Sequence, residues 1–140
     1  MQLAVKKVLS LELARGVAEA AKAFAHERGW AVTVAIVDAG GALVYFERED
    51  GIAPGTVQVA ILKAQSAAAF GVPSKSFEDS VSEGLIGLVG LPGMAPFEGA
   101  VPIRVDGQTI GAIAASGVTK EADGSIAQAG ADAVARILAE

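Results

Sequence analysis

Apolar residues near the start of the chain recur with the period of a helix. Leu13, Val17 and Phe24 fall on one face, and charged side chains fall on the opposite face. Ser10 stands where a hydroxyl oxygen can accept a hydrogen bond from the first free backbone amides of a helix. The pattern therefore predicts a helix from about Leu11 to Arg28.

Two pairs of apolar runs are separated by tight turns. The run Trp30–Val37 is followed by an Asp-Ala-Gly-Gly turn and the returning run Ala42–Phe46. A second pair extends from Val101 to Ile113 around Asp106-Gly107, a dipeptide typical of two-residue hairpin turns. Strands joined in this way pair antiparallel, so both runs predict hairpins.

The remaining segments predict further helices and a weak strand. Thr56 caps an expected helix that ends at Phe70, and a short helix is expected over 76–83. The apolar but glycine-interrupted run 85–91 predicts a weak strand, and Asp123 or Ser125 is the expected cap of a last helix. This order of elements indicates an α+β fold with a central antiparallel sheet, covered by helices on both faces because several strands are apolar on both sides.

The second strand of the 101–113 hairpin continues into residues with almost no side chain. Gly111, Ala112, Ala114 and Ala115 lead into Ser116-Gly117. A strand gives up packing area in this way mainly where another backbone, a helix or a ligand must come close. We therefore expect a close approach at this strand.

Composition bounds the size and the assembly of the protein. At 140 residues the chain forms one domain, 1–140. Hydrophobic residues make up 52% of it, charged residues only 19%, and it has 17 glycines. So many small apolar side chains favour closely packed backbones, and the scarcity of charge suggests apolar surface buried between subunits.

Charge and cysteine content exclude several partners. The formal net charge of -5 argues against nucleic acid, which needs a basic surface. Without cysteine there are no disulfides and no thiolate metal sites. No apolar run approaches about 20 residues and the first ten residues do not resemble a signal peptide, so we expect no membrane span and a cytoplasmic protein.

Taken together, the motifs resemble the GlcG/HbpS family, which also occurs as the C-terminal domain of PduO-type cobalamin adenosyltransferases. The likeness covers nearly the whole chain and is carried by Ala35–Gly41, Arg48–Gly51, Lys63–Ala67 and the stretch from Pro102 to Gly117, with Asp123 and Ile126–Gly130 at the last helix.

The resemblance implies a profilin-like three-layer α/β/α fold and a homo-oligomer, from dimer to octamer. It also implies haem as a possible cofactor, because some relatives bind haem; others accompany glycolate or diol catabolism without an established activity. This chain departs from the family's usual pattern at Glu49, where methionine is typical, and at Ser66, where threonine is typical.

Few residues here are of the types that ligate haem iron, namely His, Met, Cys and Tyr. They are His26, Met1, Met94 and Tyr45, and Ser66 offers a hydroxyl at the family's threonine position. Each has an ordinary alternative: a solvated histidine on a charged helix face, a methionine that fills a gap, and a tyrosine in the core or an interface.

Arg48, Asp50 and Lys63 form the most informative polar set. Arg48 and Lys63 are suited to clamp a carboxylate or a haem propionate, and Asp50 to orient Arg48 or accept a proton. The alternative is a salt-bridged loop or a subunit contact. Lys63 falls on the same helix face as Val59 and Phe70, where an ammonium requires a partner or a ligand.

Backbone amides and a hydroxyl form a last candidate site near the sheet edge. Gly99, Ala100 and Ser116 are suited to bind an oxyanion, although close helix packing explains the same small residues. One histidine leaves little scope for histidine-based catalysis or metal binding.

Three hypotheses follow from the sequence. The first is a homo-oligomeric protein that binds a small anionic molecule or haem. The second is an enzyme of small-acid catabolism, a lyase or isomerase in which Asp50 or Lys63 is the acid–base group. The third is a structural accessory subunit without a ligand.

Overall fold

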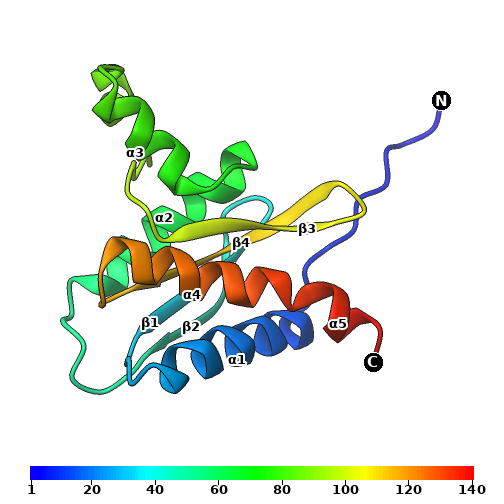
Figure 1. Ribbon diagram of the computed structural model, residues 1–140. Coiled ribbons are helices and arrows are strands. Elements are labelled where there is room, and N and C mark those ends of the chain that lie inside the picture. The colour runs from blue at the N-terminus through cyan, green and yellow to red at the C-terminus, as the bar shows by residue number, and fades with distance from the viewer.

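A four-stranded antiparallel sheet with the strand order β2-β1-β4-β3 forms the centre of the molecule. The computed structural model describes residues 1–140 (Figure 1). The strands are β1 (Thr33–Asp38), β2 (Leu43–Arg48), β3 (Ala100–Val105) and β4 (Gln108–Ser116). The helices are α1 (Leu11–Glu27), α2 (Thr56–Phe70), α3 (Ser74–Ser82), the 3-10 helix η1 (Ile86–Gly90), α4 (Lys120–Asp132) and α5 (Val134–Leu138). The α+β fold with a central antiparallel sheet is thus confirmed.

Both predicted hairpins form, because their turn residues suit the backbone. In the β1–β2 turn, Asp38 Oδ1 accepts hydrogen bonds from the amides of Gly40 and Ala42, both at 2.9 Å. In the β3–β4 turn, Asp106 and Gly107 both have positive φ, 50° and 75°. This is the combination for which Asp-Gly is favoured in two-residue hairpins.

Helices cover both faces of the sheet, as the sequence predicts (Figure 1). On one face α1 and α4 pack on branched side chains such as Val34, Ile36 and Ile113. On the other face α2 packs on β1, β3 and β4 through alanines, among them Ala60 and Ala114. Three layers result, with the smaller side chains on the α2 side.

The close approach expected at the second hairpin is also observed. A Cβ on Gly111 would collide with the carbonyl oxygen of Val37 on the neighbouring strand. Ala112 and Ala114 are fully buried beneath α2. The small residues of β4 therefore allow the adjacent strand and helix to pack at short range.

Three predictions about local structure are wrong. Thr56 does not cap α2: it is the first residue of the helix, the N-cap is Gly55, and no side chain caps this end. Within the run 85–91, Ile86–Gly90 forms η1 rather than a strand, because glycines interrupt the run and no neighbouring strand is there to pair with it. The last helix begins earlier than expected: Thr119 is its N-cap, and its Oγ1 accepts a hydrogen bond from the Ala122 amide at 3.2 Å. Asp123 and Ser125, the expected caps, both lie inside α4.

The interior face of α2 also differs from the expected one. Lys63 and Ser66 are buried as expected, but they lie among alanines. Val59 and Phe70, which were placed on the same face, are exposed. The short side chains of alanine let α2 sit close to the sheet and turn the larger residues outward.

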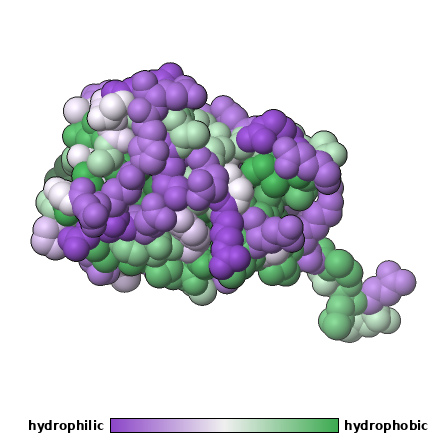
Figure 2. Space-filling view, turned by 90° about the horizontal axis from the view of Figure 1, so that it is seen from below, coloured by the Kyte–Doolittle hydropathy of each residue, from purple (hydrophilic) through white to green (hydrophobic).

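Two apolar segments extend from the body of the molecule. The N-terminal segment contacts the β3–β4 hairpin, where Leu9 is buried and the Lys7 amide donates to Gln108, and the residues before Lys7 extend away from it; Figure 2 shows an apolar segment standing clear of the rest. It carries Leu3, Val5 and Val8, all exposed; the segment that includes η1 carries Ile86 and Val89, also exposed. None of the helices combines the length and the apolar character needed to cross a bilayer.

Candidate functional site

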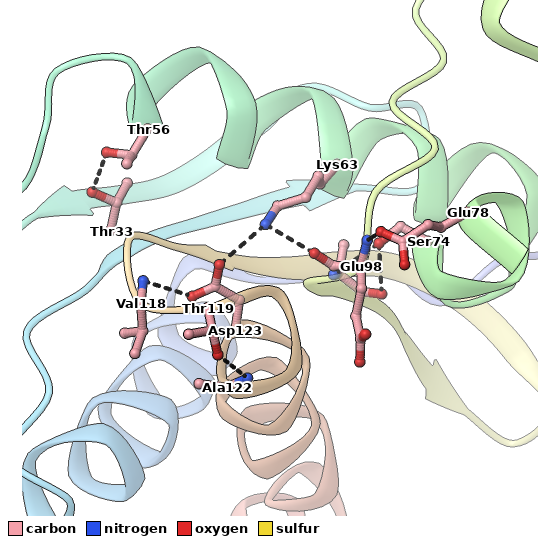
Figure 3. Close-up of polar contacts among 11 residues, drawn as sticks. Thr33, Thr56, Lys63, Ser74, Glu78, Glu98, Val118, Thr119, Ala122 and Asp123 are labelled. Carbon is pink, nitrogen blue, oxygen red and sulfur yellow. Dashed lines mark hydrogen bonds and ion pairs between the residues drawn. The ribbon is translucent and has the colours of Figure 1, made fainter. Parts of the chain in front are cut away.

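Lys63 connects the two helical layers. Its side chain is only 1% exposed, and it reaches from α2 past the start of β3 to the first turns of α4 (Figure 3). Nζ donates a hydrogen bond to the backbone carbonyl of Glu98 at 3.2 Å and lies 3.6 Å from Oδ2 of Asp123. An ammonium carries three N–H donors, so these two contacts leave one without a protein partner in the structure.

Gly99 makes room for the ammonium of Lys63. It has φ +136°, and a Cβ at this position would collide with Nζ and come within 2.9 Å of the Ala115 carbonyl oxygen. Only glycine adopts such a backbone without strain. The predicted importance of Gly99 therefore has a steric basis that involves Lys63 directly.

Helix α3 holds the segment against which Lys63 packs. The Glu98 amide donates to Glu78 Oε1 at 3.2 Å, and the Ala100 amide donates to Ser74 Oγ at 3.0 Å (Figure 3). Ser74 is fully buried. These bonds fix the position of the Glu98 carbonyl that receives the Lys63 hydrogen bond.

Asp123 is held in place by the backbone that precedes α4. Its Oδ1 accepts a hydrogen bond from the Val118 amide at 3.1 Å, while Oδ2 faces Lys63. Burial raises the pKa of Asp123, against the opposing effects of Lys63 and of the amides of Val118 and Gly117. Burial likewise lowers the pKa of Lys63, against the attraction of Asp123. Loss of hydration outweighs ion pairing for both groups, so the uncharged amine and uncharged acid are favoured more than in water.

Two carboxylates beside this pair have different environments. Glu78 forms an ion pair with Lys120 at 2.8 Å, which holds its pKa below the ordinary value despite partial burial. Burial raises the pKa of Glu98; the charge of Lys75 opposes this shift, and the nearby charges of Glu121 and Glu78 add to it. The Lys63–Asp123 pair thus lies next to a cluster of further titratable groups.

An apolar cavity of about 330 Å³ adjoins Lys63. Lys63 is its one charged lining residue; the others are Val59, Leu62, Ala95, Pro96 and Phe97. Val59 and Phe97 are 41% and 54% exposed, so the cavity opens to solvent. Its volume lies at the lower end of the range for small-molecule pockets.

A second cavity, of about 460 Å³, brings together two residues singled out in the sequence, Ser66 and Met94. It lies between the β1–β2 turn, α2 and the loop 91–94, and its lining includes Gln65, Phe70 and Leu91. The Ser66 hydroxyl accepts from the Ala95 amide at 2.8 Å and has the carbonyls of Leu62 and Gly93 within reach as acceptors. This hydroxyl therefore anchors the loop to α2. Met94 supplies the sulfur atom among the residues that line the cavity.

Arg48 and Asp50 are not brought to Lys63 within one chain. Both are exposed, and the side-chain hydrogen bond of Arg48 goes to the carbonyl of Ile52 at 3.4 Å. Arg48 is the last residue of β2 and Asp50 follows it, at the opposite edge of the sheet from β3. The single-chain clamp predicted from the sequence is therefore not formed.

The other candidate residues have ordinary contacts. The ring nitrogen Nε2 of His26 lies 2.7 Å from Glu49 at the surface, and Tyr45 donates to Glu47 at 2.8 Å. Met1 is fully exposed, and Ser116 is a buried position of β4 that pairs with Thr33 of β1.

The sequence reasoning missed the partners of Lys63. The sequence predicts Asp123 as a helix cap and no role for Glu98, although both lie beside the ammonium. One signal was present: a lysine on the apolar face of a helix requires a polar partner. Nothing local to Lys63 identifies a partner 60 positions away, because the contact depends on how α2 and α4 flank the sheet.

Comparison with known proteins gives consistent matches. The family model for haem degrading protein HbpS-like matches residues 9–132. Protein GlcG of Escherichia coli (strain K12) is 35% identical over 111 residues, which cover 79% of this chain and 83% of that protein.

Solved structures match over nearly the same extent. Klebsiella pneumoniae protein ORFY has a TM-score of 0.89 at 28% identity and covers 96% of this chain and 97% of its own. A PduOC:Heme complex has a TM-score of 0.82 at 27% identity and covers 91% and 95%. Sequence and structure thus agree, and the chain belongs to the HbpS-like family.

Proposed function

We propose that this protein is a homo-oligomeric small-molecule-binding protein that takes haem or a small carboxylate. The observation that carries the proposal is the match to the PduOC:Heme complex over 91% of the chain, at an identity high enough to indicate more than a shared fold. The description of the matching family model, haem degrading protein, supports the same ligand.

The cavity at Met94 is the proposed haem site. Met94 supplies a thioether of the kind that ligates haem iron, and Phe70, Leu91 and Pro92 supply apolar contact for the ring. No lysine or arginine lines the cavity, so the propionates would face solvent or a neighbouring subunit. When bound, haem would supply a redox-active iron.

The exposed apolar segments support the homo-oligomer. Large apolar side chains are exposed in two clusters: Met1, Leu3, Val5 and Val8 at the N-terminus, and Leu85, Ile86, Val89 and Leu91 at η1. Monomeric proteins rarely expose such clusters, and a second copy of the chain would bury them. The proposed assembly is a homo-oligomer, from dimer to octamer, in the cytoplasm.

The buried Lys63–Asp123 pair favours an acid–base enzyme as the second candidate function. A lysine with a lowered pKa and an acid with a raised pKa, close together beside a cavity, are typical of catalytic sites. This geometry supports Lys63 as the acid–base group rather than the exposed Asp50. A lyase or isomerase acting on a small acid remains the reaction class proposed for it.

Titration of the purified protein with hemin tests the haem proposal. We expect a saturable shift of the Soret band, and a loss of affinity of at least about tenfold in Met94→Leu, which keeps the volume but removes the sulfur. His26→Gln is the matched control and should bind hemin normally. Absence of a saturable shift, or equal loss in both variants, would refute haem binding at this cavity; native mass spectrometry of the same samples counts the subunits.

A further inference from the structure

The cavity beside Lys63 is an apolar groove at the surface. Lys63 contributes its stem to the wall, because Nζ is turned toward Glu98 and Asp123 between the layers. The rest of the lining is apolar, and Val59 and Phe97 are exposed at its mouth. A polar ligand would lose its hydration there without a hydrogen bond in return, so the groove favours apolar side chains.

The same chain carries an apolar segment that also lacks a partner. Residues 1–6, the N-terminal arm, extend from the body of the molecule (Figure 1), and Leu3 and Val5 are 90% and 87% exposed. Residues two apart in an extended chain point to the same side, so these two side chains form one apolar face. The root of the arm is fixed, since the Lys7 amide donates to Oε1 of Gln108 at 3.3 Å.

The arm is too short to fill the groove of its own chain. Lys63 lies beside Gly99, whose Cβ position is 2.9 Å from the carbonyl oxygen of Ala115. Ala115 is near the end of β4, and the root of the arm is at Gln108, where β4 begins. Seven residues of strand separate the two ends, a distance of ~23 Å. Val5 and Leu3, two and four residues before Lys7, reach at most ~7 and ~14 Å from it. An arm that fills this groove therefore belongs to a second copy of the chain.

The charges of the arm and of the rim of the groove are complementary. Lys6 follows Val5 directly; it is exposed and forms no ion pair within the chain. Glu98 follows Phe97 directly, and its backbone amide and carbonyl are both bonded within the chain, but its carboxylate has neither a hydrogen bond nor an ion pair. When Val5 packs on Phe97, the ammonium of Lys6 comes next to this carboxylate and supplies the missing cation.

We infer that the N-terminal arm of one copy docks into the apolar groove of a second copy, with Leu3 and Val5 against its lining. The inference rests on the homo-oligomer of the proposed function and names the segment that joins its subunits. It does not involve the cavity at Met94. The substrate of the second candidate function would compete with the arm, because both would need the groove beside Lys63.

Cysteine cross-linking tests the contact between copies. The chain has no cysteine of its own, so Leu3→Cys combined with Phe97→Cys introduces two thiols at exposed positions. On mild oxidation we expect chains linked between positions 3 and 97, located by peptide mapping, at a yield at least about tenfold above that of the matched pair Ala4→Cys with Phe97→Cys. Residue 4 is the control because its side chain faces the other side of the arm.

The outcomes separate this inference from the homo-oligomer itself. Native mass spectrometry of the same variants before oxidation counts the subunits. An oligomer without the link between positions 3 and 97, or a link formed within one chain, would overturn the inference and leave the homo-oligomer standing. Monomers alone would refute both. Equal yields from the two cysteine pairs would overturn the assignment of Leu3 and Val5 to the groove.

Serine variants test the energetic role of the arm. Leu3→Ser combined with Val5→Ser should raise the dissociation constant of the oligomer at least about tenfold, since two aliphatic side chains lose their burial. Gln2→Ser combined with Ala4→Ser alters the other side of the same segment and should leave the constant unchanged. Sedimentation velocity over a range of concentrations measures both. The same dissociation constant in the two variants would overturn the inference, and neither variant touches the folded body of the protein.

Discussion

The two faces of the sheet are covered by helices with side chains of very different size. On the α1 and α4 face, Val17, Ile36, Ile113 and Ile126 are all fully buried. On the α2 face the buried cluster consists of alanines and one valine, and the same helix buries Lys63. Large aliphatic side chains supply most of the apolar area on one face, while small ones on the other leave room for a charged side chain and for cavities.

The largest expected effect is the loss of a branched side chain from the α1 and α4 face. Ile113→Ala should lower the free energy of unfolding by about 4 kcal/mol, because the side chain is fully buried and leaves a cavity. Ala114 is the next residue along β4 and lies on the opposite face. Ala114→Gly should lower the free energy of unfolding by only about 1 kcal/mol. Urea denaturation measures both, and equal losses would contradict the division between the faces.

The second effect concerns the charged pair in the alanine layer. Lys63→Met should lower the free energy of unfolding by about 3 kcal/mol at pH 7, since Asp123 is left buried without its cation. Lys120→Met, which breaks the exposed ion pair with Glu78, should cost less than about 1 kcal/mol.

A double variant sharpens this second prediction. Lys63→Met combined with Asp123→Asn should recover at least about 1 kcal/mol relative to Lys63→Met alone, because the buried charge is removed. If the double variant is as unstable as the sum of the two single variants, Lys63 and Asp123 do not interact as described.

The smallest effect is expected for the exposed pair at the end of β2. Arg48→Ala and Asp50→Ala should each change the free energy of unfolding by no more than about 0.5 kcal/mol, since both side chains are exposed. A loss of more than about 1 kcal/mol in either variant would show that these side chains have partners beyond the contacts within one chain.

The features that the sequence predicts well are those with local causes. Asp106-Gly107 specifies its hairpin turn through the backbone preferences of two residues, and Ser10 specifies the start of α1 through one hydrogen bond, at 3.1 Å from the Leu13 amide. The antiparallel sheet follows from the two hairpins. These features need no knowledge of distant contacts.

The candidate site depends on distant contacts, so the sequence predicts it only in part. Lys63 stands out because an ammonium on an apolar helix face needs a partner, yet its partners come from β3 and α4. The sequence predicts Arg48 as its partner in binding a carboxylate, but the strand order places β2 and β3 at opposite edges. Strand order is a property of the whole chain, and short segments do not encode it.

The state of the Lys63 amine is the most direct test of the account. Lysine side chains labelled with ¹³C at Cε can be titrated individually by NMR, with Lys63→Met to assign the signal. We expect the Lys63 signal to titrate below the ordinary value of 10.5, and those of Lys75 and Lys120 above it. A Lys63 signal that titrates at or above 10.5 would contradict the claim that the alanine layer holds a buried, readily deprotonated amine.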